Sequence, residues 1–310
     1  MPELRFEDHT YQVDDFDTVL NTLLKNGHAI PNFCRGGICH SCMMKAEEGT
    51  PLPFTQIGLS DELIAENYFL TCQCAVYAPM TIRRPDREKR TRFIAMVREK
   101  EHLSENVVKL VLSPAHEFVY QAGQYTTLIN VDGLSGDFPI ASVRGEEGGL
   151  MEFHIANHSD DPLNQYIFSE LAVEDGLEIQ TALGDCYYNE SLHDQDVLVV
   201  AVDEALASGL SLLSKATQSD HRGQLSLFCV QSRVEKTYFD NALMSAVLPD
   251  SVLNQFAAAD NDEDVLNLVK ATIDKAGQDT LVLVAAAPEL ANQLIALAPE
   301  RCRSISVEKA

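Results

Sequence analysis

The sequence predicts a multi-domain protein in which an α+β part is followed by an α/β part. Its 310 residues are enough for two or three domains, each with a core of its own. Before about residue 196, short strand-like runs are separated by turn residues, and after it apolar runs alternate with helical segments. A charged, proline-led stretch, PDREKRTR at residues 85–92, interrupts the first pattern and indicates a linker.

The residues before this linker predict a small sheet with helices beside it. Two short strands are expected within Leu4–Val13, around a turn at His9-Thr10. Asp14–Asn26 is expected to form a helix, because its apolar residues share one face, acids begin it and a glycine follows it. A shorter helix is expected at Asp61–Glu66, and Thr81-Ile82 closes the sheet.

Four cysteines in this part are candidate metal ligands: Cys34, Cys39, Cys42 and Cys72. The first three are spaced C-x4-C-x2-C and the fourth follows at a distance, which is the plant-type arrangement for a [2Fe–2S] cluster. Gly36 and Gly37 let the backbone approach the cluster and point N–H groups at its sulfides. Zinc is the alternative, although structural zinc sites usually bring two short pairs of ligands. Four ordinary core cysteines would explain neither the spacing nor the glycines.

The segment after the linker predicts a small antiparallel β-barrel. Its strands are expected at Phe93–Val97, Val107–Leu112, Tyr125–Val131, Phe138–Val143, Leu150–Ile155 and Leu177–Thr181, with one helix at Leu163–Leu171. Turn residues, mostly glycines, separate the strands. The expected domains are therefore residues 1–85 and residues 92–190.

Residues 195–310 predict a doubly wound parallel sheet, because apolar strands alternate with helices. The expected strands are Val197–Val202, Leu225–Val230, Val252–Phe256, Leu281–Val284 and Ser304–Val307. The expected helices are one that continues through Leu213, then Tyr238–Ser245, Glu263–Ala276 and Pro288–Leu297.

This order of domains resembles the iron–sulfur reductase components of bacterial oxygenases, within the ferredoxin–NADP reductase superfamily. The resemblance covers nearly the whole chain and is closest at PNFCRGGICHSC, residues 31–42, and FLTCQC, residues 69–74. It implies a β-grasp ferredoxin domain, a flavin-binding barrel and a nucleotide-binding domain. In such proteins a hydride passes from NAD(P)H to FAD, and single electrons leave through the cluster. It also implies that Cys74 is not a ligand.

The flavin motif of this family is altered here. Where the family has Arg-x-Tyr-Ser/Thr, this chain has Gly136-Asp137-Phe138-Pro139, so the arginine that pairs with the FAD pyrophosphate is missing. The residues that the resemblance assigns to a flavin are Phe138, Ile140, Ala141 and Ser142. We expect FAD to be possible and weakly bound.

The dinucleotide site has departed further from the family. Its Gly-Gly-Thr-Gly, which lets the backbone approach a pyrophosphate, corresponds here to Val202-Asp203-Glu204-Ala205. Its Cys-Gly-Pro-Pro, beside the nicotinamide, corresponds to Ala285-Ala286-Ala287-Pro288. We expect Asp203 and Glu204 to stabilise the start of the helix and to exclude NAD(P)H, because carboxylates favour a helix N-terminus and repel phosphates.

Composition constrains the partners and the compartment. The net charge of −24 argues against nucleic acid and anionic membranes. It suits docking on a redox partner protein with a basic patch, and it equally suits solubility. We expect a cytoplasmic protein without signal peptide or membrane insertion, in a compartment that keeps its eight cysteines reduced.

Three functions remain open at this point. The first is electron transfer through the [2Fe–2S] cluster, on a reductase scaffold that does not use NAD(P)H in the usual way. The second is an active NAD(P)H-dependent reductase that supplies electrons to an oxygenase. The third is a non-redox assembly or regulatory protein that senses redox state or iron through its cluster.

Overall fold

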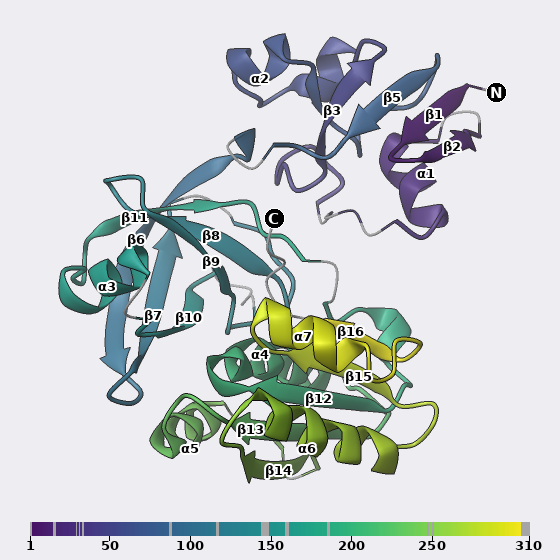
Figure 1. Cartoon of the computed structure of the whole chain (residues 1–310). Helices are drawn as coiled ribbons and strands as arrows, with labels where there is room; N and C mark the ends of the chain where they lie inside the picture. The colour runs from purple at the N-terminus through teal and green to yellow at the C-terminus, as the bar shows by residue number, and fades with distance from the viewer. Residues whose placement is uncertain are drawn as a thin grey trace. The chain divides into compact units, whose positions relative to one another are not determined.

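The computed structural model describes the chain except for residues 1, 15–16, 29, 31, 33, 87–88, 116–117, 144–148, 159–160, 185–186, 247, 250 and 305–310. The described chain forms two compact units (Figure 1). Unit 1 comprises Met1–Arg92 with Gln180–Asp185, and unit 2 comprises Phe93–Ile179 with Cys186–Ala310. The finer division into three domains stays a prediction.

Unit 1 is built on a five-stranded sheet in the order β2-β1-β5-β3-β4. Its strands are β1 (Glu3–Phe6), β2 (His9–Gln12), β3 (Met43–Glu48), β4 (Tyr68–Leu70) and β5 (Met80–Arg83). Among the strand pairs that the structure describes in unit 1, β1 and β5 are parallel and the other pairs are antiparallel. Helices α1 (Val19–Lys25) and α2 (Asp61–Ala65) and the short 3-10 helix η1 (Pro53–Gln56) complete the unit.

Two expected boundaries in unit 1 were wrong. The turn between β1 and β2 lies at residues 7–8 rather than at His9-Thr10, because Phe6 pairs with His9 and Glu7 takes a left-handed φ of 53°. Helix α1 begins at Val19 rather than Asp14. Thr18 caps it, since its backbone is extended and its hydroxyl accepts the Asn21 N–H at 3.1 Å.

The first part of unit 2 is a six-stranded sheet in the order β10-β7-β6-β11-β8-β9. Its strands are β6 (Arg92–His102), β7 (Val107–Pro114), β8 (Tyr125–Ile129), β9 (Ser135–Pro139), β10 (Met151–Ala156) and β11 (Gly176–Gln180), and helix α3 spans Pro162–Ser169. The pairs of β10 with β7, β7 with β6, β11 with β8 and β8 with β9 are antiparallel, as predicted.

Strand β9 ends earlier than the expected strand Phe138–Val143. After Pro139 the chain leaves β8, with the Ile140 N–H bonded to the Gln124 carbonyl at 2.9 Å. The Ala141 N–H then reaches the Glu152 carbonyl of β10 at 2.7 Å. The flavin candidates Ile140, Ala141 and Ser142 therefore lie after the end of β9 and not within it.

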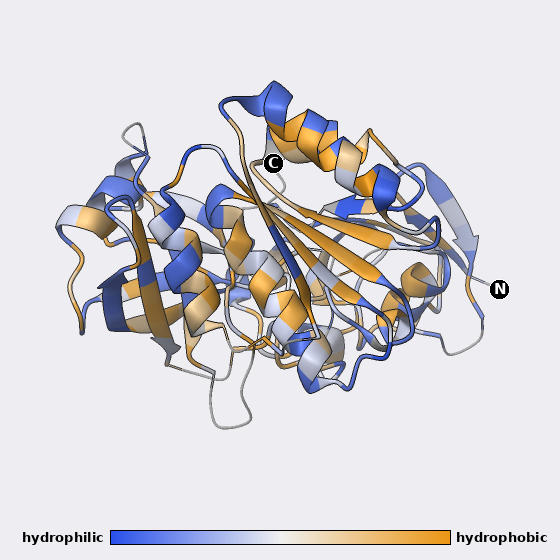
Figure 2. Cartoon of the chain, turned by 90° about the horizontal axis from the view of Figure 1, so that it is seen from below, coloured by the Kyte–Doolittle hydropathy of each residue, from blue (hydrophilic) through white to orange (hydrophobic). Residues whose placement is uncertain are grey.

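The second part of unit 2 is a five-stranded parallel sheet in the order β14-β13-β12-β15-β16. Its strands are β12 (Val197–Val202), β13 (Leu225–Gln231), β14 (Leu253–Ala258), β15 (Leu281–Ala285) and β16 (Cys302–Ser304). All six residues of β12 are buried, which explains its continuous apolar sequence. In Figure 2 the strands of this sheet are largely orange, whereas the helices beside it carry both orange and blue.

Helices cover both faces of the parallel sheet, as a doubly wound fold requires. They are α4 (Leu206–Gln218), α5 (Lys236–Ser245), α6 (Asp262–Lys275) and α7 (Pro288–Ile295). One core joins α4 and α5 to the sheet and also contains Val107 of β7, and a second core lies under α6 and α7. None of the helices in the described part of the chain is long and apolar enough to cross a membrane.

Candidate functional site

The loop that carries Cys34, Cys39 and Cys42 lies between α1 and β3, and Cys72 lies two residues after the end of β4. The loop turns sharply because Arg35, Gly37 and His40 all take left-handed backbone angles, with φ of 47°, 79° and 54°. At Gly37 a Cβ would also lie only 3.3 Å from the Gln73 side chain, so glycine is needed there for two reasons. The sequence thus bends this loop toward the segment that carries the fourth cysteine.

Backbone N–H groups converge on the sulfur of Cys34. The N–H groups of Gly36, Ile38 and Cys39 lie 3.3, 3.4 and 3.4 Å from its Sγ atom. Partial burial alone would raise the pKa of Cys34, but these donors outweigh it and lower the pKa below its ordinary value. A sulfur so surrounded is prepared to be a thiolate, which is the form that binds metal.

The sulfur atoms of the other three cysteines also lie beside hydrogen-bond donors or beside another cysteine. The Ser41 hydroxyl donates to the Cys39 sulfur at 3.2 Å, and the Gln73 amide donates to the Cys72 sulfur at 3.4 Å. A hydrogen bond with Cys42 lowers the pKa of Cys72 to about 6, and the same pairing raises the pKa of Cys42. The chemistry of this donor set fits a thiolate-bound cluster, and the assignment of the four ligands stays a prediction.

Cys74 has a different environment. It is 2% exposed, belongs to the core of unit 1, and burial raises its pKa to about 11. A neutral, buried thiol of this kind behaves as a core side chain. Among the described residues, no three His, Cys, Asp or Glu side chains are grouped so as to hold a single metal ion.

The residues expected to hold a flavin are divided between the core and a cavity. Phe138 is 9% exposed and Ile140 is fully buried. A Cβ built on Gly136 would lie 3.0 Å from the Phe138 ring and 3.4 Å from Leu163 of α3. The Phe138 ring therefore covers the position from which the family's arginine would extend.

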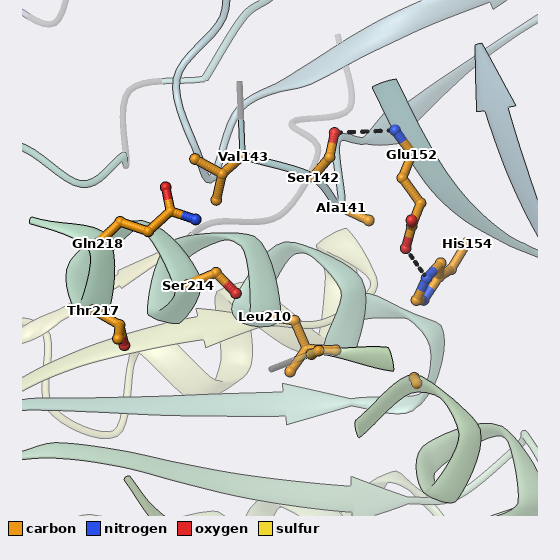
Figure 3. Close-up of a pocket in the computed structure, with 11 residues that line it drawn as sticks. Ala141, Ser142, Val143, Glu152, His154, Leu210, Ser214, Thr217 and Gln218 are labelled. Atoms are coloured by element: carbon orange, nitrogen blue, oxygen red, sulfur yellow. Dashed lines mark hydrogen bonds and ion pairs between the residues drawn. The ribbon is translucent and has the colours of Figure 1, made fainter. Parts of the chain in front are cut away.

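Ala141 and Ser142 instead line a cavity of about 290 Å³ within unit 2 (Figure 3). Glu152 and His154 of β10 face it from one side, and polar residues of α4 face it from the other: Ser214, Thr217 and Gln218. The His154 ring lies 2.9 Å from the Glu152 carboxylate and 3.0 Å from the Tyr238 hydroxyl. Glu152, His154 and Tyr238 were not predicted from the sequence, because only the folded chain brings β10 and α5 together.

Asp203 and Glu204 lie in the first turn of a helix, as expected, although the Asp203 side chain does not cap it. Residues Asp203–Ala205 form a short 3-10 helix, η4, without a side-chain cap, and α4 that follows has none either. Asp203 is 5% exposed, and its carboxylate accepts hydrogen bonds from Ser232 and Arg233 in the loop after β13. Its backbone is left-handed, with φ of 52°, a conformation that favours glycine.

Glu204 also bonds away from the helix. Its Oε1 atom lies 3.2 Å from His158 Nε2, and its carbonyl accepts the Tyr238 hydroxyl at 3.2 Å. His158 precedes α3, where the family places a contact to the FAD phosphate. The segment before α3 and the start of η4 therefore contact each other.

Arg233, in the loop after β13, is paired with a carboxylate. The guanidinium of Arg233 lies 3.1 and 3.2 Å from the carboxylate oxygens of Asp262. Ala285 and Ala286, at the end of β15, are buried.

Comparison with known proteins shows a known domain in part of the chain and relatives that match more of it. Residues 4–77 match the model of the 2Fe-2S iron-sulfur cluster binding domain. Phenol hydroxylase P5 protein of Acinetobacter pittii (strain PHEA-2) is 26% identical over 234 residues, which are 71% of this chain and 64% of that one. Terephthalate 1,2-dioxygenase reductase component 2 of a Comamonas species is 28% identical over 174 residues, 54% of this chain and 51% of that one.

The chain resembles the iron–sulfur reductase components of bacterial oxygenases. It spans about half to two thirds of the length of the curated relatives it matches. Two solved structures share this reductase-like fold over 99% of the chain. The first is the ferredoxin reductase in carbazole 1,9a-dioxygenase, with a TM-score of 0.61 and 14% sequence identity, and the match covers 98% of that chain. The second is a cytochrome P450 reductase from Amycolatopsis, with a TM-score of 0.59 and 16% sequence identity, and the match covers 99% of that chain.

Residues 4–77 thus match an iron–sulfur cluster binding domain, and the fold of the whole chain is like that of these reductases.

Proposed function

We propose that this protein transfers electrons through a [2Fe–2S] cluster held by Cys34, Cys39, Cys42 and Cys72, and that it does not take hydride from NAD(P)H in the usual way. When bound, such a cluster accepts and releases one electron at a time. The N–H groups directed at Cys34 support the ligand assignment, because they stabilise the charged thiolate.

The observation that carries the second half of the proposal is the buried carboxylate of Asp203. A dinucleotide pyrophosphate binds where backbone N–H groups at a helix N-terminus are accessible. Here two carboxylates, those of Asp203 and Glu204, stand at that position and both are bonded to neighbouring segments. Two like charges about 4 Å apart repel by roughly 4 kcal/mol near a protein surface. Charge and bulk therefore both oppose the dinucleotide.

Flavin binding is proposed to be weak. The scaffold favours FAD, because a ferredoxin NADP+ reductase of this fold from Neisseria gonorrhoeae holds bound FAD and NADP. Against it, Gly136 supplies no charge for the phosphates, and the Phe138 ring lies close to Gly136 and is too buried to offer a face for stacking. We expect any flavin to separate from the protein on desalting, which absorbance before and after the column will measure.

The redox partner is proposed to be a protein with a basic docking patch. The net charge of −24 favours association with a positive surface and makes the association rate sensitive to salt. The relatives named as components of oxygenase systems support a protein partner rather than a small acceptor.

An active NAD(P)H-dependent reductase is the second candidate. Two observations favour it: the names of the curated relatives, and the left-handed backbone of Asp203, which keeps a conformation suited to the family's glycine. Steady-state oxidation of NADH and NADPH with a dye acceptor separates the two candidates. We expect no turnover above the rate without protein, and steady turnover would establish the second candidate instead.

A further inference from the structure

A chain of polar groups inside unit 2 plays no part in the proposed function. The Glu152 carboxylate lies 2.9 Å from Nε2 of the His154 ring, and the Tyr238 hydroxyl lies 3.0 Å from Nδ1 of the same ring. The hydroxyl also lies 3.2 Å from the Glu204 carbonyl oxygen. His154 is 5% exposed and Tyr238 is fully buried, so the ring and the phenol are kept from bulk water. The three contacts connect β10 through α5 to η4.

The two ends of this chain only accept hydrogen bonds. Burial alone would raise the pKa of Glu152, but the hydrogen bond with His154 outweighs it and lowers the pKa below its ordinary value. The carboxylate is therefore ionised at neutral pH, and an ionised carboxylate has no proton to donate. The Glu204 group is a carbonyl, which has none either. Each end thus needs a donor from the middle of the chain.

The middle of the chain is one proton short when His154 is neutral. Burial raises the pKa of Tyr238 well above its ordinary value, so the phenol keeps its single proton. A neutral imidazole has one N–H, and Glu152 requires it at Nε2. The phenol proton then serves either Nδ1 or the Glu204 carbonyl, but not both. Three contacts need three protons, and the two neutral side chains supply two.

We propose that Glu152, His154 and Tyr238 form a proton-binding site in which His154 is held as an imidazolium. Its Nε2–H donates to Glu152, its Nδ1–H donates to the Tyr238 oxygen, and the phenol proton is left for the Glu204 carbonyl. The charged ring is paired with a carboxylate, which is the usual condition for burying a charge. The inference is independent of the cluster and of the nucleotide sites.

The cavity gives the proton a route to solvent. Figure 3 shows the contact between Glu152 and His154 at the wall of this cavity. The Glu152 side chain is 33% exposed, whereas that of His154 is 3% exposed. The carboxylate therefore exchanges protons with water and the ring behind it stores them.

The charges around the ring favour a cation. Lys109 of β7 pairs with His154 across the sheet, but two acids of β6 hold its ammonium group at 2.7 Å each. Two further acids lie near Tyr238, and the thiol beside it is neutral because burial raises its pKa to about 12. These neighbours are Glu99 and Glu101 of β6, Asp203 and Glu204 of η4, and Cys229 of β13.

The bound proton decides which partner the phenol serves. With an imidazolium, Nδ1 donates to the Tyr238 oxygen and the phenol donates to the Glu204 carbonyl. With a neutral ring, the phenol donates to Nδ1 and the carbonyl loses this donor. The proton therefore completes a continuous set of hydrogen bonds that fastens η4 to β10.

Nitrogen-15 resonances of the histidine rings test the inference on the full-length protein. The signals that disappear in His154→Gln identify His154. At about pH 7.5 an unperturbed histidine, whose pKa is about 6.5, is mostly neutral. We expect both ring nitrogens of wild-type His154 to show the shift of a protonated nitrogen at this pH. The carbon-13 shift of the Glu204 carbonyl reports the phenol proton at the other end.

Two variants should release the proton. Tyr238→Phe removes the partner of Nδ1, and Glu152→Gln removes the anion that pairs with the ring. In both we expect a neutral His154 at the same pH, and in Tyr238→Phe the Glu204 carbonyl signal should also move. Glu101→Gln is the matched control, because this acid contacts Lys109 and not the ring. It should leave the imidazolium in place.

Two results would overturn the inference. One is a neutral His154 ring in the wild type at about pH 7.5, and this measurement decides the matter even if a variant does not fold. The other is an imidazolium that persists in both Tyr238→Phe and Glu152→Gln, since the three side chains would then not form one site. Neither result bears on the dye assay, which tests the proposed function separately.

Discussion

The Nε2 atom of His158 lies 3.2 Å from the Oε1 atom of Glu204. This contact joins the segment before α3 to the start of the parallel-sheet part of unit 2. The His158 side chain is 46% exposed and that of Glu204 is 29% exposed, so solvent screens the pair.

We therefore predict that Glu204→Gln changes stability little. The pair should contribute at most about 1 kcal/mol, because both side chains are partly solvated. Urea unfolding of the variant should give a midpoint close to that of the wild type. A large loss would mean that this contact holds the two parts of unit 2 together.

The cluster should require four cysteines and not the fifth. Serine at position 34, 39, 42 or 72 should reduce the content of iron and sulfide, whereas Cys74→Ser should keep it, because Cys74 is a neutral core thiol. Iron and acid-labile sulfide per chain, with the visible absorbance, measure this. If Cys74→Ser loses the cluster and Cys72→Ser retains it, the ligand assignment is wrong.

The two glycines of the cysteine loop, Gly36 and Gly37, should differ in how well they tolerate replacement by alanine. Gly37→Ala should lower cluster content several-fold, because its φ is 79° and the new Cβ would lie 3.3 Å from Gln73. Gly36→Ala is the matched control. Its Cβ would meet nothing closer than the Cys34 carbonyl at 3.6 Å, and the N–H that points at Cys34 is kept. Equal cluster content in the two variants would contradict the role given to the loop backbone.

A methyl group at Gly136 should destabilise unit 2. The Cβ of Gly136→Ala would press on the Phe138 ring at 3.0 Å, and overpacking of this kind costs about 1–3 kcal/mol. Gly176→Ala, in β11, is the control, since its nearest neighbour would be a methionine sulfur at 3.9 Å. Thermal unfolding of both variants is the measurement, and a neutral Gly136→Ala would show that the ring moves easily enough to admit a flavin.

NAD(P)H should not bleach the cluster at a useful rate, even when the acids are removed. Replacing both Asp203 and Glu204 with glycine relieves the repulsion and should allow weak binding. Turnover should still fail, because Ala285–Pro288 lacks the family's groups beside the nicotinamide and a misplacement of about 1 Å can cost a hundredfold in rate. Calorimetry followed by anaerobic mixing measures both steps. Bleaching of the wild type within seconds would contradict this.

The parts of the fold set by local sequence were predicted well. The run Val197–Val202 became β12 without a change of boundary, since a strand buried on both faces needs continuous apolar residues. The helix expected at Asp61–Glu66 became α2, with Ser60 as its cap. In both cases the neighbouring residues alone carry the signal.

The errors came where a distant segment decides the outcome. Asp203 begins a short helix as expected, but its carboxylate accepts hydrogen bonds from the loop after β13, and these were not predicted. Phe138 was expected to offer a stacking face, but it is buried beside Gly136. Neither contact leaves a trace in the sequence around the residue concerned, so only the folded chain reveals it.

The segment Gln180–Asp185 has a consequence for how this protein can be divided. It belongs to unit 1, although it follows Phe93–Ile179 in the chain, and the Thr181 N–H bonds to the Thr91 carbonyl at 3.2 Å. A gene fragment that stops at the linker would encode the whole sheet of unit 1 and omit part of its packing. Transplanting the iron–sulfur half onto another protein, in the laboratory or by recombination, would therefore keep this contact only with a second, downstream splice.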